Sequence, residues 1–147
     1  MADSIRQQIM NAVKTRLQAI TTVNGYNYNL GSNVFEWRNT PVSDSELPAL
    51  IYRDISCDTE YFETHRHRLH IEVELAIKDI AASTIRKMIA DVIKAIGVDV
   101  QWSNLAINTH PEGDEIIIKQ SEKIIEGASV KFAIEFRTKE WDPYTTI

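Results

Sequence analysis

Hydrophobic residues recur every three or four positions in two stretches of the chain, which predicts two amphipathic helices. The first covers residues 4–21, and Ser4 and Gln7 have the spacing of a capping box at its start. The second covers residues 82–96, and Gly97 follows it where a glycine commonly ends a helix. The apolar positions are Ile5, Ile9, Val13, Leu17 and Ile20 in the first helix, and Ile85, Met88, Ile89, Val92, Ile93 and Ile96 in the second.

Alternation of hydrophobic and polar residues predicts a strand over residues 69–78, beginning as early as Arg66. Period two with one polar face is typical of a half-buried strand in an antiparallel sheet. The alternating apolar residues are Leu69, Ile71, Val73, Leu75 and Ile77. Further strands are predicted at residues 34–38, 49–54, 115–120 with a continuation toward 125, and 130–136.

The order of these elements predicts the fold class. Turn-forming residues predict loops at 24–33 and 40–48 and a turn at 110–114, and residues 138–147 form a polar, aromatic tail that is loose or docks on a neighbour. We therefore expect a single α+β domain over residues 1–147. It consists of a mostly antiparallel sheet of about four to six strands, with two main helices packed on one face.

Composition narrows the classes of function. The chain has 147 residues, enough for one domain with a real core, and its net charge of −5 disfavours a general nucleic-acid surface, because neutralising phosphates needs Lys and Arg. The single cysteine, Cys57, excludes an internal disulfide. The start of the chain lacks the pattern of a signal peptide, and no apolar run approaches the roughly 20 residues that span a bilayer. We expect no membrane association and no cofactor.

One cluster has the residue types of a metal site. Cys57 precedes His65, His67 and His70, and all four side chains are metal-ligand types. On a strand, however, His65 and His67 share one face while His70 points to the other, and the intervening arginines repel a cation. One hypothesis is a small metal-binding or hydrolytic domain that uses Cys57, His65 and His67. The alternative is a polar, solvated strand end.

Other residues give weaker indications of catalysis. Glu72 and Glu74 lie two apart on a predicted strand, so they share an exposed face, and a solvated face explains them better than acid–base chemistry. The glycines are scattered singly, without a phosphate-binding loop. We therefore expect a protein that is not an enzyme and that works by binding or assembly.

The order of the predicted elements and a few local phrases, over residues 4–138, resemble those of a known protein family. The phrases are Asn24-Gly25-Tyr26 after the first helix, Val34-Phe35-Glu36-Trp37-Arg38, Glu46-Leu47-Pro48-Ala49-Leu50 entering a strand, the helix from Thr84 to Ile96, and Phe132-Ala133-Ile134-Glu135-Phe136-Arg137. In these features the chain resembles the tail-terminator and tail-completion proteins of long-tailed bacteriophages and their prophage relatives.

The resemblance implies a non-enzymatic virion protein, made in the bacterial cytoplasm and located in the virion tail. Such proteins form a ring, commonly a hexamer, at the head-proximal end of the tail tube. The partners it implies are other copies of the chain, the tail-tube protein and the head–tail connector, with DNA only passing through the lumen. A head–tail joining protein or another minor tail protein is the alternative within this class.

No motif marks the contact surfaces, so candidates follow from physical features. The long loops, the polar face of the alternating strand and the C-terminal segment are the regions expected to meet partners. Deletion of residues 139–147 is expected to leave the fold intact and to weaken assembly. The candidate interface residues are Asn24, Tyr26, Tyr28, Glu46, His70, Glu72, Glu74, Trp141 and Tyr144.

Overall fold

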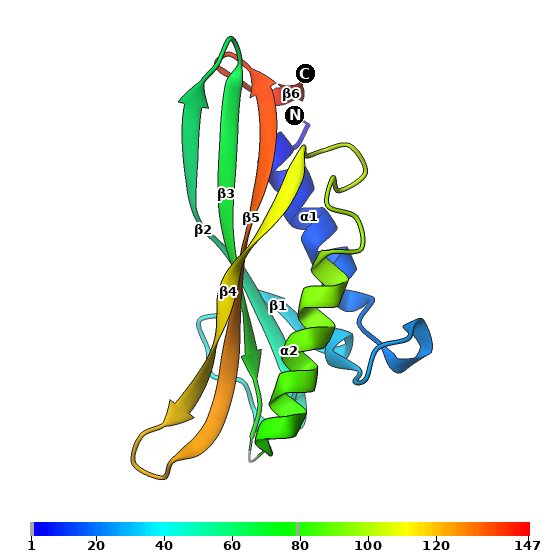
Figure 1. The fold of residues 1–147 in the computed structure, drawn as a ribbon, viewed down its shortest axis with the longest axis vertical. Helices are drawn as coiled ribbons and strands as arrows, with labels where there is room; N and C mark the ends of the chain where they lie inside the picture. The colour runs from blue at the N-terminus through cyan, green and yellow to red at the C-terminus, as the bar shows by residue number, and fades with distance from the viewer. Residues whose placement is uncertain (1, 79) are drawn as a thin grey trace.

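The computed structural model describes residues 2–78 and 80–147, and within them it has two helices and a six-stranded sheet (Figure 1). This confirms the predicted α+β class. The helices are α1 (Ile5–Gln18) and α2 (Ala82–Ile96). The strands are β1 (Val34–Glu36), β2 (Ala49–Tyr61), β3 (His65–Ala76), β4 (Asn108–Lys119), β5 (Ile124–Lys139) and β6 (Asp142–Thr146).

The sheet is mixed rather than purely antiparallel, because β1 and β2 run parallel. The strand order is β1-β2-β3-β5-β4, with β6 pairing to β5, and every pair is antiparallel except β1 with β2. A parallel neighbour needs a crossover rather than a tight hairpin. Residues 37–48 supply that crossover and include the short 3₁₀ turn Asp44–Glu46.

Several strands are longer than their alternation indicated. β2 runs on to Tyr61, and β4 already begins at Asn108, so residues 110–114 lie in a strand and the predicted turn there is wrong. A bulge between Pro111 and Gly113 explains the mismatch, because Gly113 has φ 105° and the proline sits on an edge strand. The C-terminal segment is not a loose tail, since β5 continues to Lys139 and β6 pairs back onto it.

The core lies between the sheet and the two helices. The inward residues of β3 that the alternation predicted are buried, and each pairs across to a buried residue of β5, as Leu69 does with Ile134. Both helices bury most of their apolar stripes in the same cluster, so they cover one face of the sheet. Ile93, predicted in the stripe of the second helix, is instead 46% exposed. Burial of this apolar surface is the main stabilising contribution to such a fold.

The helices stop short of one end of the sheet. At the top of Figure 1, the β2–β3 turn extends past the start of α1. There the inward row of β3 changes from Leu69 to His67 and His65, which are only partly buried. Among the described residues, no helix is long and apolar enough to cross a membrane.

Candidate functional site: an aromatic end of the sheet

Two turns bring large exposed side chains together at this end. Tyr61 ends β2, Phe62 lies in the β2–β3 turn and Trp141 lies in the β5–β6 turn. Their exposed fractions are 66%, 71% and 85%, respectively. The two turns lie side by side at the top of Figure 1. We name Tyr61, Phe62, His65, His67 and Trp141 the aromatic end. A group of exposed aromatic residues in one place is typical of a contact surface.

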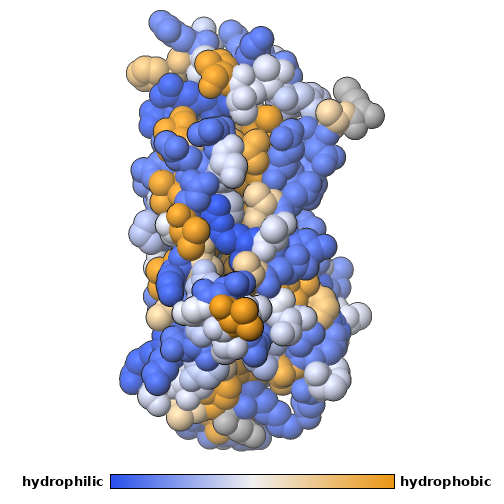
Figure 2. Space-filling view, turned by 90° about the vertical axis from the view of Figure 1, so that its right-hand side faces the viewer, coloured by the Kyte–Doolittle hydropathy of each residue, from blue (hydrophilic) through white to orange (hydrophobic). Residues whose placement is uncertain are grey.

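On the side of the molecule seen in Figure 2, the exposed hydrophobic residues are distributed differently. Hydrophobic residues are visible there as separate spots within a mostly hydrophilic surface. One of the most exposed apolar residues of the chain is Val23, at 94%, which lies in the short 3₁₀ turn Thr22–Asn24. Apolar residues exposed singly are normal and need no functional explanation.

His65 organises the rings of the aromatic end. Its ring centroid lies 5.0 Å from that of Trp141, 6.4 Å from that of Tyr61 and 6.1 Å from that of His67, each in an edge-to-face arrangement. His67 in turn stacks on the buried Phe136 at 4.6 Å. Edge-to-face and offset contacts at these distances are favourable, so the exposed rings are connected to the core.

The backbone holds Trp141 outward at a cost. Its φ is 55°, in the left-handed region that bulky residues rarely adopt. Its N–H donates to His65 Nδ1 at 3.4 Å, a long hydrogen bond between the two turns. Strained backbone at an exposed large side chain is a feature that concentrates at functional sites.

A hollow opens between the two turns. It has a volume of about 500 Å³ and is open to solvent. Its floor and walls come from β2, β3, β5 and the β5–β6 turn, which are far apart in the sequence. The lining residues are Thr59, Tyr61, His65, His67, Thr138, Trp141, Asp142 and Pro143.

His67 forms the floor of this hollow as a neutral ring. Its Nε2 lies 2.8 Å from the hydroxyl of the buried Thr138, and its Nδ1 lies 2.9 Å from the hydroxyl of Thr59. Burial, followed by the neighbouring His65, lowers the pKa of His67 below its ordinary value. The hydroxyls satisfy both nitrogens without requiring a charge, so His67 is uncharged at neutral pH.

His70 lies on the opposite face, as the strand parity predicted. Its Nε2 is 2.8 Å from Asp58 and its Nδ1 is 2.8 Å from Glu112. Hydrogen bonds to Glu112 and then Asp58 raise the pKa of His70. Beside it, Arg53 bonds Glu72 at 2.8 Å and Glu74 at 3.0 Å. The predicted contact residues His70, Glu72 and Glu74 therefore pair within the chain.

The structure does not assemble the hypothetical metal or hydrolytic site. Cys57 lies opposite Leu69 in the β2–β3 ladder, and burial raises the pKa of its thiol, which opposes a reactive thiolate. Both ring nitrogens of His67 already have hydroxyl partners. In residues 2–78 and 80–147, no three His, Cys, Asp or Glu side chains are grouped to hold a metal ion.

The loop at residues 24–33 is fastened to α2. The buried carboxylate of Asp91 accepts hydrogen bonds from the backbone N–H groups of Asn27 and Tyr28, at 3.1–3.2 Å. Lys94 lies over the ring of Tyr26, 5.0 Å from its centroid. Tyr26 and Tyr28 pack against the core and are only partly exposed, whereas Asn24 is exposed and bonds the carbonyl of Ala19.

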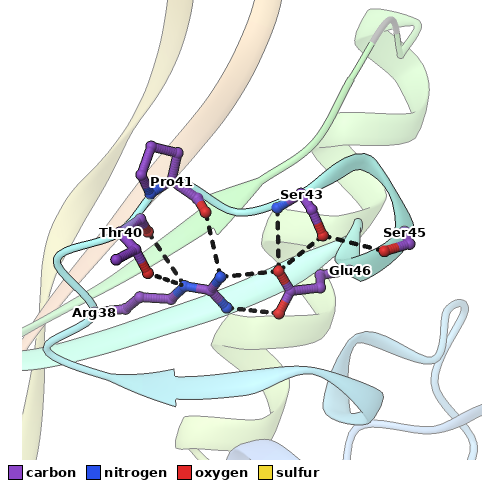
Figure 3. A network of polar contacts seen from close by, with 6 residues as sticks. All are labelled: Arg38, Thr40, Pro41, Ser43, Ser45 and Glu46. Atoms are coloured by element: carbon purple, nitrogen blue, oxygen red, sulfur yellow. Dashed lines mark hydrogen bonds and ion pairs between the residues drawn. The ribbon is translucent and has the colours of Figure 1, made fainter.

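Glu46 is likewise engaged within its own loop (Figure 3). Arg38 donates to both of its carboxylate oxygens, at 2.6 and 2.8 Å, and also bonds the carbonyls of Thr40 and Pro41. Glu46 also accepts from the backbone N–H and the hydroxyl of Ser43. The Arg38 bonds and then those from Ser43 lower the pKa of Glu46 to about 2. This network holds the crossover loop in shape.

Of the predicted interface residues, Trp141 lies in the aromatic end and Tyr144 on the adjoining β6. Tyr61 and Phe62 were missed, although they stand between two alternating runs, where a hairpin tip presents its side chains. The exposed rings of the site can stack on other rings and attract cations. No protein-family model matches this chain, and no curated protein matches it.

Proposed function

We propose that this chain is a structural subunit of a phage tail, of the tail-terminator or tail-completion class, and that the aromatic end is one of its protein contacts. The observation that carries the contact function is the group of Tyr61, Phe62 and Trp141, exposed together at one end of the sheet. Aromatic anchors of this kind contribute most of the binding free energy in many interfaces. The class comes from the resemblance of the sequence.

The two open edges of the sheet support assembly into a ring. In the described residues, no strand pairs with the outer side of β4, and β1 covers β2 only at Leu50–Tyr52. Unpaired edges accept further strands, and these two edges differ from each other. A contact between unlike surfaces is heterologous and generates a ring when the rotation closes. The proposed ring, commonly a hexamer in the class, uses that geometry.

The proposed partners are further copies of the chain, the tail-tube protein and the head–tail connector. The acidic net charge of −5 suits a lumen through which DNA passes without adhering. In this proposal the protein is made in the host cytoplasm, resides in the virion tail and has no catalytic activity. A head–tail joining role uses the same contact features at a different station.

The test is assembly with the tail-tube protein encoded near the same gene. Tubes grown with and without the purified chain are compared by negative-stain electron microscopy, counting tube length and end-bound rings. We expect shorter tubes with rings at one end. A Trp141→Asn chain, whose new residue suits positive φ, should need about tenfold more protein, while Val23→Ala behaves as wild type. Unchanged tube length together with bare tube ends would refute the proposal.

A further inference from the structure

Two of the three tryptophans already hold an arginine. The guanidinium of Arg16 lies 3.5 Å from the ring centroid of the buried Trp102, and that of Arg53 lies 5.9 Å from the ring of Trp37. In residues 2–78 and 80–147, no arginine or lysine lies over Trp141. We propose that the hollow beside Trp141 takes an arginine side chain from a partner protein. This inference rests on the proposed role of the aromatic end as a contact.

The charge around the hollow favours a cation. Glu63 and Glu140 lie in the two turns beside the hollow, and Lys139 and Asp142 flank the β5–β6 turn, whereas Glu60 is paired with Arg66 across β2 and β3. Asp142 lines the hollow itself. Hydrogen bonds from Thr145 and the Tyr144 N–H lower the pKa of Asp142, so its carboxylate is ionised at neutral pH. A cation that enters the hollow therefore meets the Asp142 carboxylate beside aromatic rings.

The floor of the hollow does not oppose a cation. Both His67 nitrogens bond to hydroxyls, and the ring is uncharged at neutral pH. The rings of Tyr61 and Trp141 each contact His65 edge-to-face, and both residues are largely exposed to solvent. A cation within about 6 Å of such a ring is attracted by its quadrupole. The hollow of about 500 Å³ has room for a whole side chain.

The chemistry of the site fits arginine better than lysine. A guanidinium is planar and weakly hydrated, stacks on aromatic faces and bonds a carboxylate through two parallel N–H groups. Trp141 in the β5–β6 turn supplies the face, and Asp142, the next residue and the first of β6, supplies the carboxylate. An ammonium keeps its water more tightly and lacks the planar fork. The chain itself already places arginine on two of its tryptophans.

The probe is a blocked tripeptide, acetyl-Gly-Arg-Gly-amide, titrated into the ¹⁵N-labelled full chain. The three indole N–H signals are followed by NMR, and loss of one signal in Trp141→Phe assigns that of Trp141. We expect the arginine peptide to shift this signal and those of the two turns, at millimolar concentration. The lysine peptide should bind several-fold more weakly, and the citrulline peptide, which has the same shape but no charge, at least tenfold more weakly.

Variants locate the site. Trp141→Asn should abolish the shifts, Asp142→Asn should weaken binding several-fold, and Trp37→Phe, at the other partly exposed tryptophan, should change nothing. Equal affinity for the arginine and citrulline peptides, or full binding by Trp141→Asn, overturns the proposal. Equal affinity for the lysine peptide overturns the choice of arginine.

The two proposals fail separately. If the peptide does not bind but tube capping still depends on Trp141, the arginine site is rejected and the tail role stands. If the peptide binds but Trp141→Asn caps tubes normally, the cation site stands and the aromatic end is rejected as the assembly contact.

Discussion

Two histidines three residues apart on β3 show how the two faces of one strand impose opposite chemistry. His67 faces the uncovered end of the core, where burial lowers its pKa, and His70 faces the polar side, where Glu112 and Asp58 raise its pKa. The order of the two pKa values is thus set by strand parity. We expect a pH titration followed by histidine ring NMR signals to place His67 below 6.5 and His70 above it. The reverse order would contradict the assigned contacts.

The sign of the His70 contribution follows from the same contacts. A pKa raised in the folded state stabilises below the unfolded value and loses that contribution as pH rises through the folded pKa. His70→Gln should therefore lower the free energy of unfolding at pH 5 by about 0.5 kcal/mol, because its partner Asp58 is largely exposed. At pH 8.5 the two proteins should unfold at nearly the same urea concentration. An equal loss at both pH values would show that the charge is not involved.

Asp91 is a buried carboxylate that links a loop to a helix. It is 2% exposed, and its oxygens receive the N–H groups of Asn27 and Tyr28, which ties the 24–33 loop to α2. Asp91→Ala removes the acceptor of these part-buried N–H groups, and we expect the free energy of unfolding in urea to fall by about 2 kcal/mol. Asp114→Asn, at an exposed position, is the control and should stay within about 0.5 kcal/mol of wild type. If Asp91→Ala left the free energy of unfolding unchanged, water would be replacing the carboxylate as the hydrogen-bond acceptor.

At the scale of elements, the conformation of the crossover loop depends on the planar guanidinium of Arg38. Arg38 holds both oxygens of Glu46 together with two backbone carbonyls, which a lysine cannot reproduce. Arg38→Lys should speed hydrogen exchange across residues 40–47 at least several-fold, as measured by mass spectrometry. Arg86→Lys on the exposed side of α2 is the matched control. Unchanged exchange in the loop would assign its order to the surrounding packing.

The pH dependence of this loop follows from Glu46. Its folded pKa is about 2, below the ordinary 4.5, so its contribution is present above pH 4.5 and is lost as the pH falls toward 2. Loop exchange, corrected for its intrinsic pH dependence, should therefore rise only at low pH. In Arg38→Lys the rise should begin at higher pH, because the Glu46 pKa moves back toward its ordinary value.

Sequence patterns predicted correctly those elements in which one face is buried, because burial of one face imposes a regular spacing of hydrophobic residues. α1, α2 and the core half of β3 were predicted within a few residues, because their apolar stripes face one core. The parallel pairing of β1 with β2 was not predicted, since alternation records which face is buried and not the direction of the neighbour. The second half of β2 was missed because residues 55–61 are largely exposed and mix polar and apolar side chains.

The candidate site was predicted only in part for a related reason. Trp141 was recognised because it stands in a polar segment with little local core. Tyr61 and Phe62 depend on the hairpin tip that β2 and β3 build together, and that tip is defined by tertiary pairing of Tyr61 with His65. The meeting of the β2–β3 and β5–β6 turns is a long-range contact, which no local pattern encodes.

At the scale of the whole molecule, the C-terminal segment is part of the fold, and this changes what a truncation tests. β6 pairs with the end of β5 and contacts α1. Removal of residues 139–147 should therefore lower the unfolding midpoint as well as assembly, whereas the expectation from sequence was an intact fold. Trp141→Asn should lower assembly alone, since its ring is 85% exposed. Equal midpoints for the truncated and full chains would show that β6 adds no stability.

The outer edge of β4 provides the last test of assembly. Ile116 and Ile118 are 37% and 38% exposed on a twelve-residue strand whose outer side has no partner strand in the described chain. A long edge with exposed isoleucines favours pairing with another chain, and a lysine there opposes it. Ile118→Lys should raise the concentration needed for self-association about tenfold by sedimentation, without shifting the unfolding midpoint of the monomer. Val23→Lys adds the same charge at an exposed turn and should leave association unchanged. If both lysine variants associate like wild type, the sheet edge is not the subunit contact, and the aromatic end must carry assembly through a partner.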